Sequence, residues 1–373
     1  MPKHCFAEVE GVLARYGGSM SVGLIDADAV EREVGLKLAA SPIDHCVRNL
    51  THGFPDNPTY FALSEALSLN AVIGRFSNFQ CVIITWEFYK RATIFWNSLL
   101  VDKGLVNFLK SGSDPDEPDI LPVKNRGEAL AELLSNDISN DETALLGIPL
   151  NYLFMYILAS HEVGHLALGH LHRSANAYID EMGPTKSELR ISSRAREWDA
   201  DGFALGATLY LTGSDFAKEP FVKDLLVSKE ANLRIVFVVA YALFILLDEA
   251  SPQDRPLEER THPRPLVRVG LASLAVSRLL HMLGAMDASE ALDTARRAIR
   301  AVEIAVLHLA GGVMEPSLAK NLTAELAAEA DRLSASFNDQ LETLDRSRIG
   351  HYAWAGPLSQ PMPILSGENS EIG

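Results

Sequence analysis

Residues 161–165 read His-Glu-Val-Gly-His, and this motif limits the possible folds and chemistry of the chain more than any other feature. It lies in the second half of a long apolar run, residues 150–172, which predicts a helix. Residues four apart share one face of a helix, so His161 and His165 point the same way. Their ring nitrogens can both reach one zinc ion at about 2.0–2.1 Å.

Glu162 lies about 100° round the predicted helix from His161, beside the metal rather than on it. A carboxylate in that place can take a proton from a zinc-bound water, whose pKa the metal lowers to about 7. Glu162 is therefore the candidate general base. The small Gly164 and the aliphatic Val163 suit a helix packed tightly against a sheet. The alternative interpretation is a helix with two buried histidines and no metal.

A catalytic zinc also needs a third protein ligand and one open coordination position. A longer three-histidine motif fails, because Leu168 and Leu171 stand where it requires glycine and histidine. His170 and His172 lie off the zinc-binding face of an uninterrupted helix. We expect His170 to be a surface or capping residue.

The next predicted helix, residues 186–212, offers a better third ligand. Glu197 and Asp201 are four residues apart and share a face. Glu197 can bind the zinc, and Asp201 can accept a hydrogen bond from a ligand histidine and so fix its tautomer. Asp199 is expected to point elsewhere and to be exposed. The alternative is a solvated acidic face paired with neighbouring arginines.

Over residues 155–270 this pattern resembles the gluzincin zinc metallopeptidases, in which His-Glu-x-x-His is followed by Glu-x-x-Ala-Asp. It is most similar to the branch that holds HtpX and the CAAX prenyl proteases. That branch also carries a Thr-His-Pro loop followed by a basic residue, matched here by residues 261–263 and Arg268. The resemblance implies that His262 helps to stabilise the transition state. A loop histidine without such a role is the alternative.

Two groups of soluble peptidases share parts of the same pattern. The phage-exclusion peptidase Lit has a comparable motif at a comparable position in its chain. The ImmA/IrrE group has a similar Glu-x-x-Ala-x-x-Phe-Ala stretch, matched by Glu197, Ala200, Phe203 and Ala204. The sequence does not separate these groups from a soluble relative of HtpX.

The chain as a whole predicts a predominantly helical α+β protein with a zincin-like metallopeptidase core. The best strand candidate, residues 79–86, is rich in β-branched and aromatic residues and indicates a small N-terminal sheet. We expect five segments: residues 1–110 with the strands, an acidic linker at 111–124, the catalytic core at 125–285, additional helices at 286–350 and an irregular tail at 351–373.

The composition indicates which partners and which cellular compartment to expect. The chain has 33 basic and 49 acidic residues, a formal charge of −16 and no basic run, which argues against a nucleic-acid partner. The longest uncharged apolar run, residues 235–247, is shorter than the roughly 20 residues that span a bilayer. Three widely spaced cysteines fit a reducing compartment. We therefore expect a cytoplasmic protein without a membrane span.

The function predicted from the sequence is a zinc-dependent endopeptidase acting on a protein or peptide substrate. Zinc would be held by His161, His165 and Glu197, with Glu162 as general base, and a strand of the N-terminal zone would pair with the substrate. A non-catalytic or regulatory zinc protein of a phage-defence or toxin-control system is an alternative, with His170 or His172 closing the zinc site. A zinc hydrolase of a non-peptide amide is another. The oligomeric state and the cleavage preference are not predicted.

Overall fold

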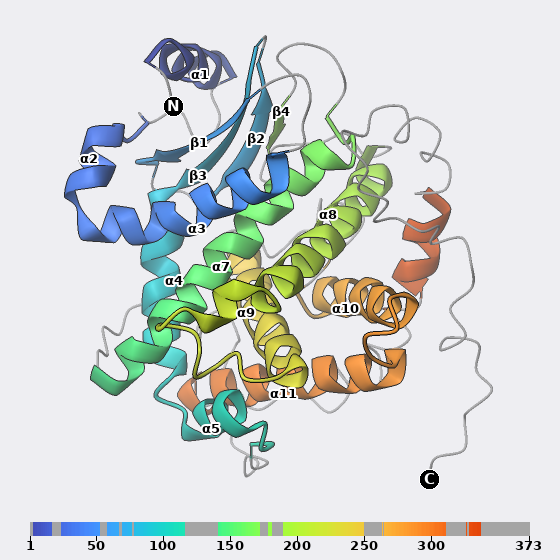
Figure 1. Cartoon of the computed structure of the whole chain (residues 1–373). Coiled ribbons are helices and arrows are strands. Elements are labelled where there is room, and N and C mark those ends of the chain that lie inside the picture. The colour runs from blue at the N-terminus through green and yellow to red at the C-terminus, as the bar shows by residue number, and fades with distance from the viewer. Residues whose placement is uncertain are drawn as a thin grey trace.

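The computed structural model describes residues 3–16, 24–52, 58–66, 69–76, 78–115, 141–171, 178–180, 189–249, 263, 265–310, 326 and 328–336. These residues form a mostly helical α+β structure with one small mixed sheet (Figure 1), as the sequence predicts.

The sheet joins three N-terminal strands to one strand that follows the motif. Its order is β1 (Thr59–Ser64), β3 (Gln80–Thr85), β2 (Ala71–Arg75) and β4 (Tyr178–Asp180). Strand β3 pairs parallel with β1 and antiparallel with β2, and β4 pairs antiparallel with β2. The strand predicted at residues 79–86 is thus confirmed as β3. One edge of the sheet is therefore formed by a strand, β4, that follows the motif helix in sequence.

Each face of the sheet is covered by different helices. Cys81 and Ile83 of β3 belong to a small cluster with residues of α1 (Lys3–Tyr16). Val82 and Ile84, which point to the opposite face, belong to the large core that includes α3 (Val34–Thr51) and α7 (Asp141–Ala167). This alternation explains why all of β3 is buried.

Helix α7 (Asp141–Ala167) carries the motif and runs through the middle of the molecule (Figure 1). It packs against α3, α4 (Trp86–Leu99), α8 (Leu189–Thr212), α9 (Lys229–Glu249) and the sheet. The run at residues 92–101, which fits either strand or helix by sequence, falls largely in α4. The remaining elements are α2 (Ala27–Arg32), α5 (Lys103–Ser111), η1 (Asp215–Lys218), α10 (Pro265–Met282), α11 (Ala288–Ala310) and a short helix at 328–336.

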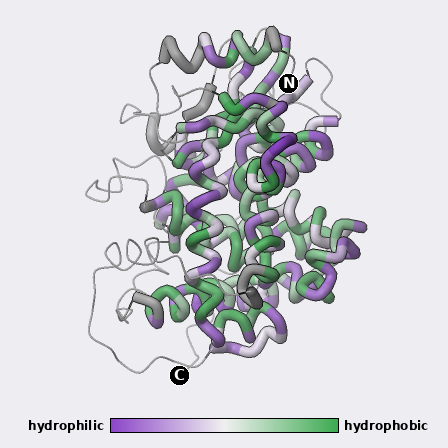
Figure 2. Tube along the Cα trace, turned by 90° about the vertical axis from the view of Figure 1, so that its left-hand side faces the viewer, coloured by the Kyte–Doolittle hydropathy of each residue, from purple (hydrophilic) through white to green (hydrophobic). Residues whose placement is uncertain are grey.

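Helix α9 is long and apolar enough to cross a membrane by length and composition: its 20-residue segment Lys229–Asp248 contains an 18-residue window with a mean hydropathy of 1.9. However, 94% of its apolar window is buried inside the protein, as in a core helix. Figure 2 shows hydrophobic residues concentrated on the inner helices. No other helix in the described part of the chain has such a stretch.

One hydrophobic core connects α3, α4, α5, α7, α8, α9, α10 and α11, so the N-terminal and C-terminal helices belong to the same core as the motif helix. The start of the predicted linker is described: Asp114 accepts a bond of 2.8 Å from Arg297 Nε of α11. Residues 116–124 and the tail at 351–373 lie outside the described residues. The segment boundaries given above therefore stay predictions.

Candidate metal centre

The close packing of α7 on α8 brings the motif to Glu197. A Cβ atom on Gly164 would lie 3.1 Å from Phe203 Cδ1 and 3.4 Å from Ala200 Cα, so a larger residue would require these neighbours to shift by a few tenths of an ångström. Helix α7 packs against the sheet, as the sequence suggests, but the neighbours of Gly164 itself are residues of α8. The glycine instead allows the two ligand-bearing helices to approach each other.

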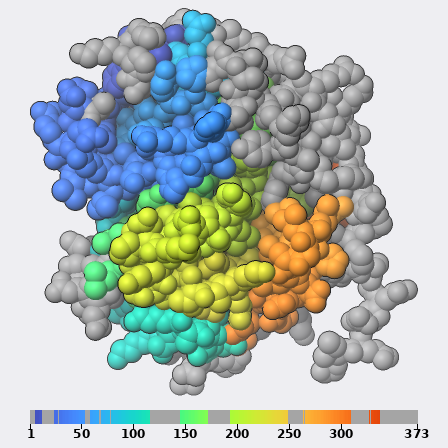
Figure 3. Space-filling model, viewed as in Figure 1, coloured from blue at the N-terminus to red at the C-terminus, as the bar shows by residue number. Residues whose placement is uncertain are grey.

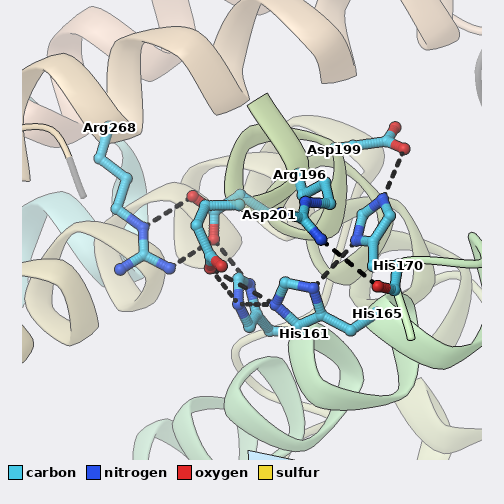
Figure 4. Close-up of polar contacts among 8 residues, drawn as sticks. His161, His165, His170, Arg196, Asp199, Asp201 and Arg268 are labelled. Atoms are coloured by element: carbon cyan, nitrogen blue, oxygen red, sulfur yellow. Dashed lines mark hydrogen bonds and ion pairs between the residues drawn. The ribbon is translucent and has the colours of Figure 1, made fainter. Parts of the chain in front are cut away.

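The three predicted ligands, His161, His165 and Glu197, converge in one buried cluster. Figure 4 shows His161 and His165 side by side in it. His161 Nε2 lies 3.1 Å from Glu197 Oε2 and 3.0 Å from His165 Nε2. His165 Nε2 lies 3.4 Å from Glu197 Oε2. Ligands placed tetrahedrally at zinc–ligand distances of about 2.0–2.1 Å are about 3.3 Å apart. The donor atoms therefore have the spacing that one zinc ion requires.

His161 is supported by an ion-paired carboxylate. Its Nδ1 lies 2.8 Å from Asp201 Oδ1. Arg268 of α10 donates to both oxygens of Asp201, from Nε at 2.7 Å and from Nη2 at 2.9 Å. Burial alone would raise the pKa of Asp201, but Arg268 and His161 lower it below its ordinary value. Asp201 is thus ionised at neutral pH and accepts the Nδ1–H of His161.

His165 is supported by a second histidine, which the sequence interpretation missed (Figure 4). His165 Nδ1 lies 2.9 Å from His170 Nδ1, and His170 Nε2 lies 3.3 Å from Asp199 Oδ2. Burial, followed by the charges of His165 and Arg196, lowers the pKa of His170 well below its ordinary value. His170 is therefore neutral, donates to Asp199 and accepts the Nδ1–H of His165.

The predictions of a surface His170 and an exposed Asp199 are wrong, since both residues are buried. The cause is the end of α7. Gly169 has a φ of 80°, its N–H bonds to Leu166 O, and the N–H of His170 bonds to His165 O at 2.9 Å. This pair of bonds is a Schellman motif, which reverses the chain after the helix. His170 is thereby folded back beneath His165, whereas an uninterrupted helix would carry it away.

Because Asp201 and His170 hold the Nδ1 protons, the atoms that face one another in the ligand cluster carry lone pairs. With Nδ1 protonated in both His161 and His165, each Nε2 presents a lone pair. Glu197, which is only 3% exposed, adds a carboxylate oxygen to the same space. Three acceptor atoms that face one another in a buried site repel unless a cation lies among them. The donor set, two imidazoles and a carboxylate, is one that zinc accepts in catalytic sites.

Burial also rules out the alternative of a solvated acidic face on α8, because Glu197, Asp199 and Asp201 are all buried. Arg194 Nε bonds to Glu329 Oε1 at 2.7 Å, in the helix at 328–336. Arg196 Nη1 lies 3.5 Å from the carbonyl oxygen of His170.

Glu162 is fully buried and follows His161 on α7, outside the three-residue ligand cluster of the described chain. The candidate transition-state residue His262 lies outside the described residues, as does His172. Arg268, the basic residue beyond the Thr-His-Pro segment, is described and reaches the centre through Asp201. Its guanidinium also lies 4.4 Å from the ring centroid of Phe244.

Comparison with protein-family models, with curated proteins and with solved structures finds no match for this chain.

Proposed function

We propose that this chain is a zinc-dependent endopeptidase of the gluzincin type, with a zincin-like core similar to that of HtpX and the CAAX prenyl proteases. The observation that carries the proposal is the convergence of His161, His165 and Glu197, whose facing atoms lie 3.0–3.4 Å apart in a buried, acceptor-only cluster. The cytoplasmic location and the protein or peptide substrate are parts of the same proposal.

A bound zinc would supply Lewis-acid charge for the scissile carbonyl and lower the pKa of water. The other roles in the reaction belong to residues of the chain. Asp201 and His170 hold the Nδ1 protons of the two ligand histidines and so fix the orientation of both rings. Glu162 takes the proton of the attacking water and passes it to the leaving amine. The resemblance adds His262 as a group that stabilises the oxyanion.

An edge strand of the sheet offers main-chain groups to which an extended peptide can bind. Strand β4 lies at one edge of the described sheet and joins the chain that follows the motif helix. The opposite edge strand, β1, carries an antiparallel bridge from Leu24 to Ser64. We therefore place substrate pairing on β4, by main-chain hydrogen bonds, in place of the N-terminal strand inferred from sequence.

The environment of His170 favours a catalytic zinc over a closed structural one. Both ring nitrogens of His170 are already engaged, with His165 and Asp199, on the side of His165 opposite its metal-facing Nε2. His170 is therefore positioned as a support for His165 and not as a fourth ligand. Among the described residues, the ligand cluster has three members, as a catalytic zinc with an open position requires.

Glu162→Gln tests the proposal. We expect hydrolysis of unfolded protein or of a mixed peptide library to fall by roughly 10²–10⁴-fold, because the amide cannot accept the proton. Zinc content should stay at the wild-type level, since Glu162 is not a ligand. Full cleavage activity in Glu162→Gln would contradict the mechanism. Cleavage of a small amide in place of peptides would instead favour a non-peptide hydrolase.

A further inference from the structure

A half-open pocket of about 290 Å³ lies between α3, α4, α7 and the segment around η1. None of its lining residues belongs to the candidate metal centre or to its supports. Figure 3 shows this side of the molecule, where the blue surface of α3 borders the yellow-green surface of the segment after α8. The pocket is close in size to the lower limit for small-molecule sites, about 300 Å³.

Aromatic rings make up much of the pocket wall. Tyr152 stacks on Phe216 with ring centroids 5.0 Å apart, and Phe221 lies 5.4 Å from Tyr152 and 5.7 Å from Phe216. Tyr89 lines the pocket from α4 and is itself stacked on Trp86 at 5.0 Å. These rings come from three separate parts of the chain, so the fold gathers them here.

The charge of the lining is negative. Glu219 is its one carboxylate, and no ion pair involves it among the described residues. The basic residues next in sequence to the lining are paired with other carboxylates: Lys37 with Glu31 at 3.0 Å, Lys90 with Glu87 at 2.5 Å and Lys218 with Asp215 at 2.6 Å.

The remaining titratable groups of the lining are uncharged at neutral pH. Burial lowers the pKa of His45, so its imidazole is neutral, and its Nδ1 lies 2.5 Å from Tyr152 Oη. Burial also raises the pKa of Tyr152, and the charges of Cys46, Asp44 and Glu219 raise it further. The pocket therefore combines aromatic walls, a negative rim and no cation of its own.

We propose that this pocket binds an organic cation, specifically an alkylated ammonium group such as a trimethylammonium. Aromatic rings attract such a cation through their quadrupoles, and the methyl groups make apolar contact with the same rings. Glu219 supplies the compensating charge. A compact, strongly hydrated ion would gain less, since aromatic walls replace little of its hydration. This site is independent of the metal centre and of the proposed peptidase activity.

The test uses the full chain and a matched pair of probes in titration calorimetry. Choline carries the trimethylammonium group, and 3,3-dimethylbutan-1-ol is its neutral carbon analogue of nearly equal shape. We expect saturable binding of choline, about tenfold tighter than that of the neutral alcohol. Only choline gains the cation–π attraction to the rings and the attraction to the Glu219 carboxylate. No saturable choline binding, or equal binding of the two probes, would overturn the proposal.

Two variants locate the binding in this pocket. Glu219→Gln and Phe221→Leu should each weaken choline about three- to tenfold, through loss of the carboxylate and of one ring respectively. Both side chains are exposed enough to be replaced without opening the core. Glu65→Gln makes the same charge change on an exposed residue away from the pocket and should bind like wild type. Equal affinity in Glu219→Gln and Glu65→Gln would place the cation elsewhere and reject the assignment.

Discussion

The two motif histidines stand four residues apart on one helix, yet different chemistry holds each of them. His161 is held by a charged branch, in which Asp201 is fixed by two hydrogen bonds from Arg268 of α10. His165 is held by a neutral branch, in which its Nδ1 contacts His170 and His170 contacts Asp199 of α8. Both branches protonate Nδ1 and free Nε2, so they reach the same ligand state by separate routes.

The difference shows which parts of the fold each ligand depends on. The charged branch requires the distant α10 to pack on α8, because Arg268 is 67 residues from Asp201. The first contact of the neutral branch is local, because the turn at Gly169 places His170 under His165, and only its second contact, with Asp199, comes from α8. We therefore expect the charged branch to matter most for folding and the neutral branch to matter most for metal affinity.

The largest effect should come from Arg268→Met. The substitution leaves Asp201 buried without its cationic partner, and loss of one partner of a buried pair costs about 3–5 kcal/mol of folding free energy. Urea unfolding of the metal-free protein measures it. The double variant Arg268→Met/Asp201→Asn should regain much of that stability, because the uncompensated charge is gone. A loss below about 1 kcal/mol in Arg268→Met would show that the pair is not important for the fold.

A smaller effect, on metal rather than folding, is expected from His170→Ala. Loss of the acceptor for the His165 Nδ1–H should weaken zinc binding by about 10–100-fold, as outer-shell substitutions do. Competition with a chelator of known affinity measures this. Asp199→Asn is the matched control, since its amide oxygen still accepts from His170, and it should lose less. Unchanged zinc affinity in His170→Ala would remove His170 from the site.

The two branches should also differ in their response to acid. The pKa of His170 is lowered in the folded chain. Below about pH 6.5, His170 is therefore protonated in the unfolded chain but stays neutral in the folded chain. Stability should fall on acidification from that point, by up to about 1.4 kcal/mol per pH unit. The pKa of Asp201 is also lowered, so its contribution is lost only as pH falls below about 3.9.

Urea unfolding of the metal-free protein between pH 7 and pH 5 separates the branches. The dependence on pH should be weaker in His170→Ala than in wild type, and nearly unchanged in Asp201→Asn. Identical slopes in wild type and His170→Ala would mean that His170 titrates normally in the folded protein.

The sequence predicted the parts of this site that depend on helical periodicity. His161, His165 and Glu197 were assigned from spacing within two helices, and the structure brings their ligand atoms together. The strand at β3 and the helices around the motif were likewise predictable from their residue patterns.

What the sequence did not predict depends on where a helix ends and on which distant helices meet. The prediction of a surface His170 fails because it requires the helix to continue past Gly169, although a glycine after an apolar run is a recognised helix-end signal. Asp199 was misplaced for the same reason, since its partner is His170. The contact of Arg268 with Asp201 and the pocket around Tyr152 join residues far apart in the chain, which no local pattern encodes.

Metal analysis of purified protein shows whether His161, His165 and Glu197 together hold one zinc ion. Wild type, Glu197→Ala and Glu162→Gln should be prepared side by side and dialysed against the same weak chelator. We predict one zinc per chain in wild type and in Glu162→Gln, and less than about a tenth of that in Glu197→Ala, which keeps only two ligands. Full zinc in Glu197→Ala, or none in wild type, would contradict the account.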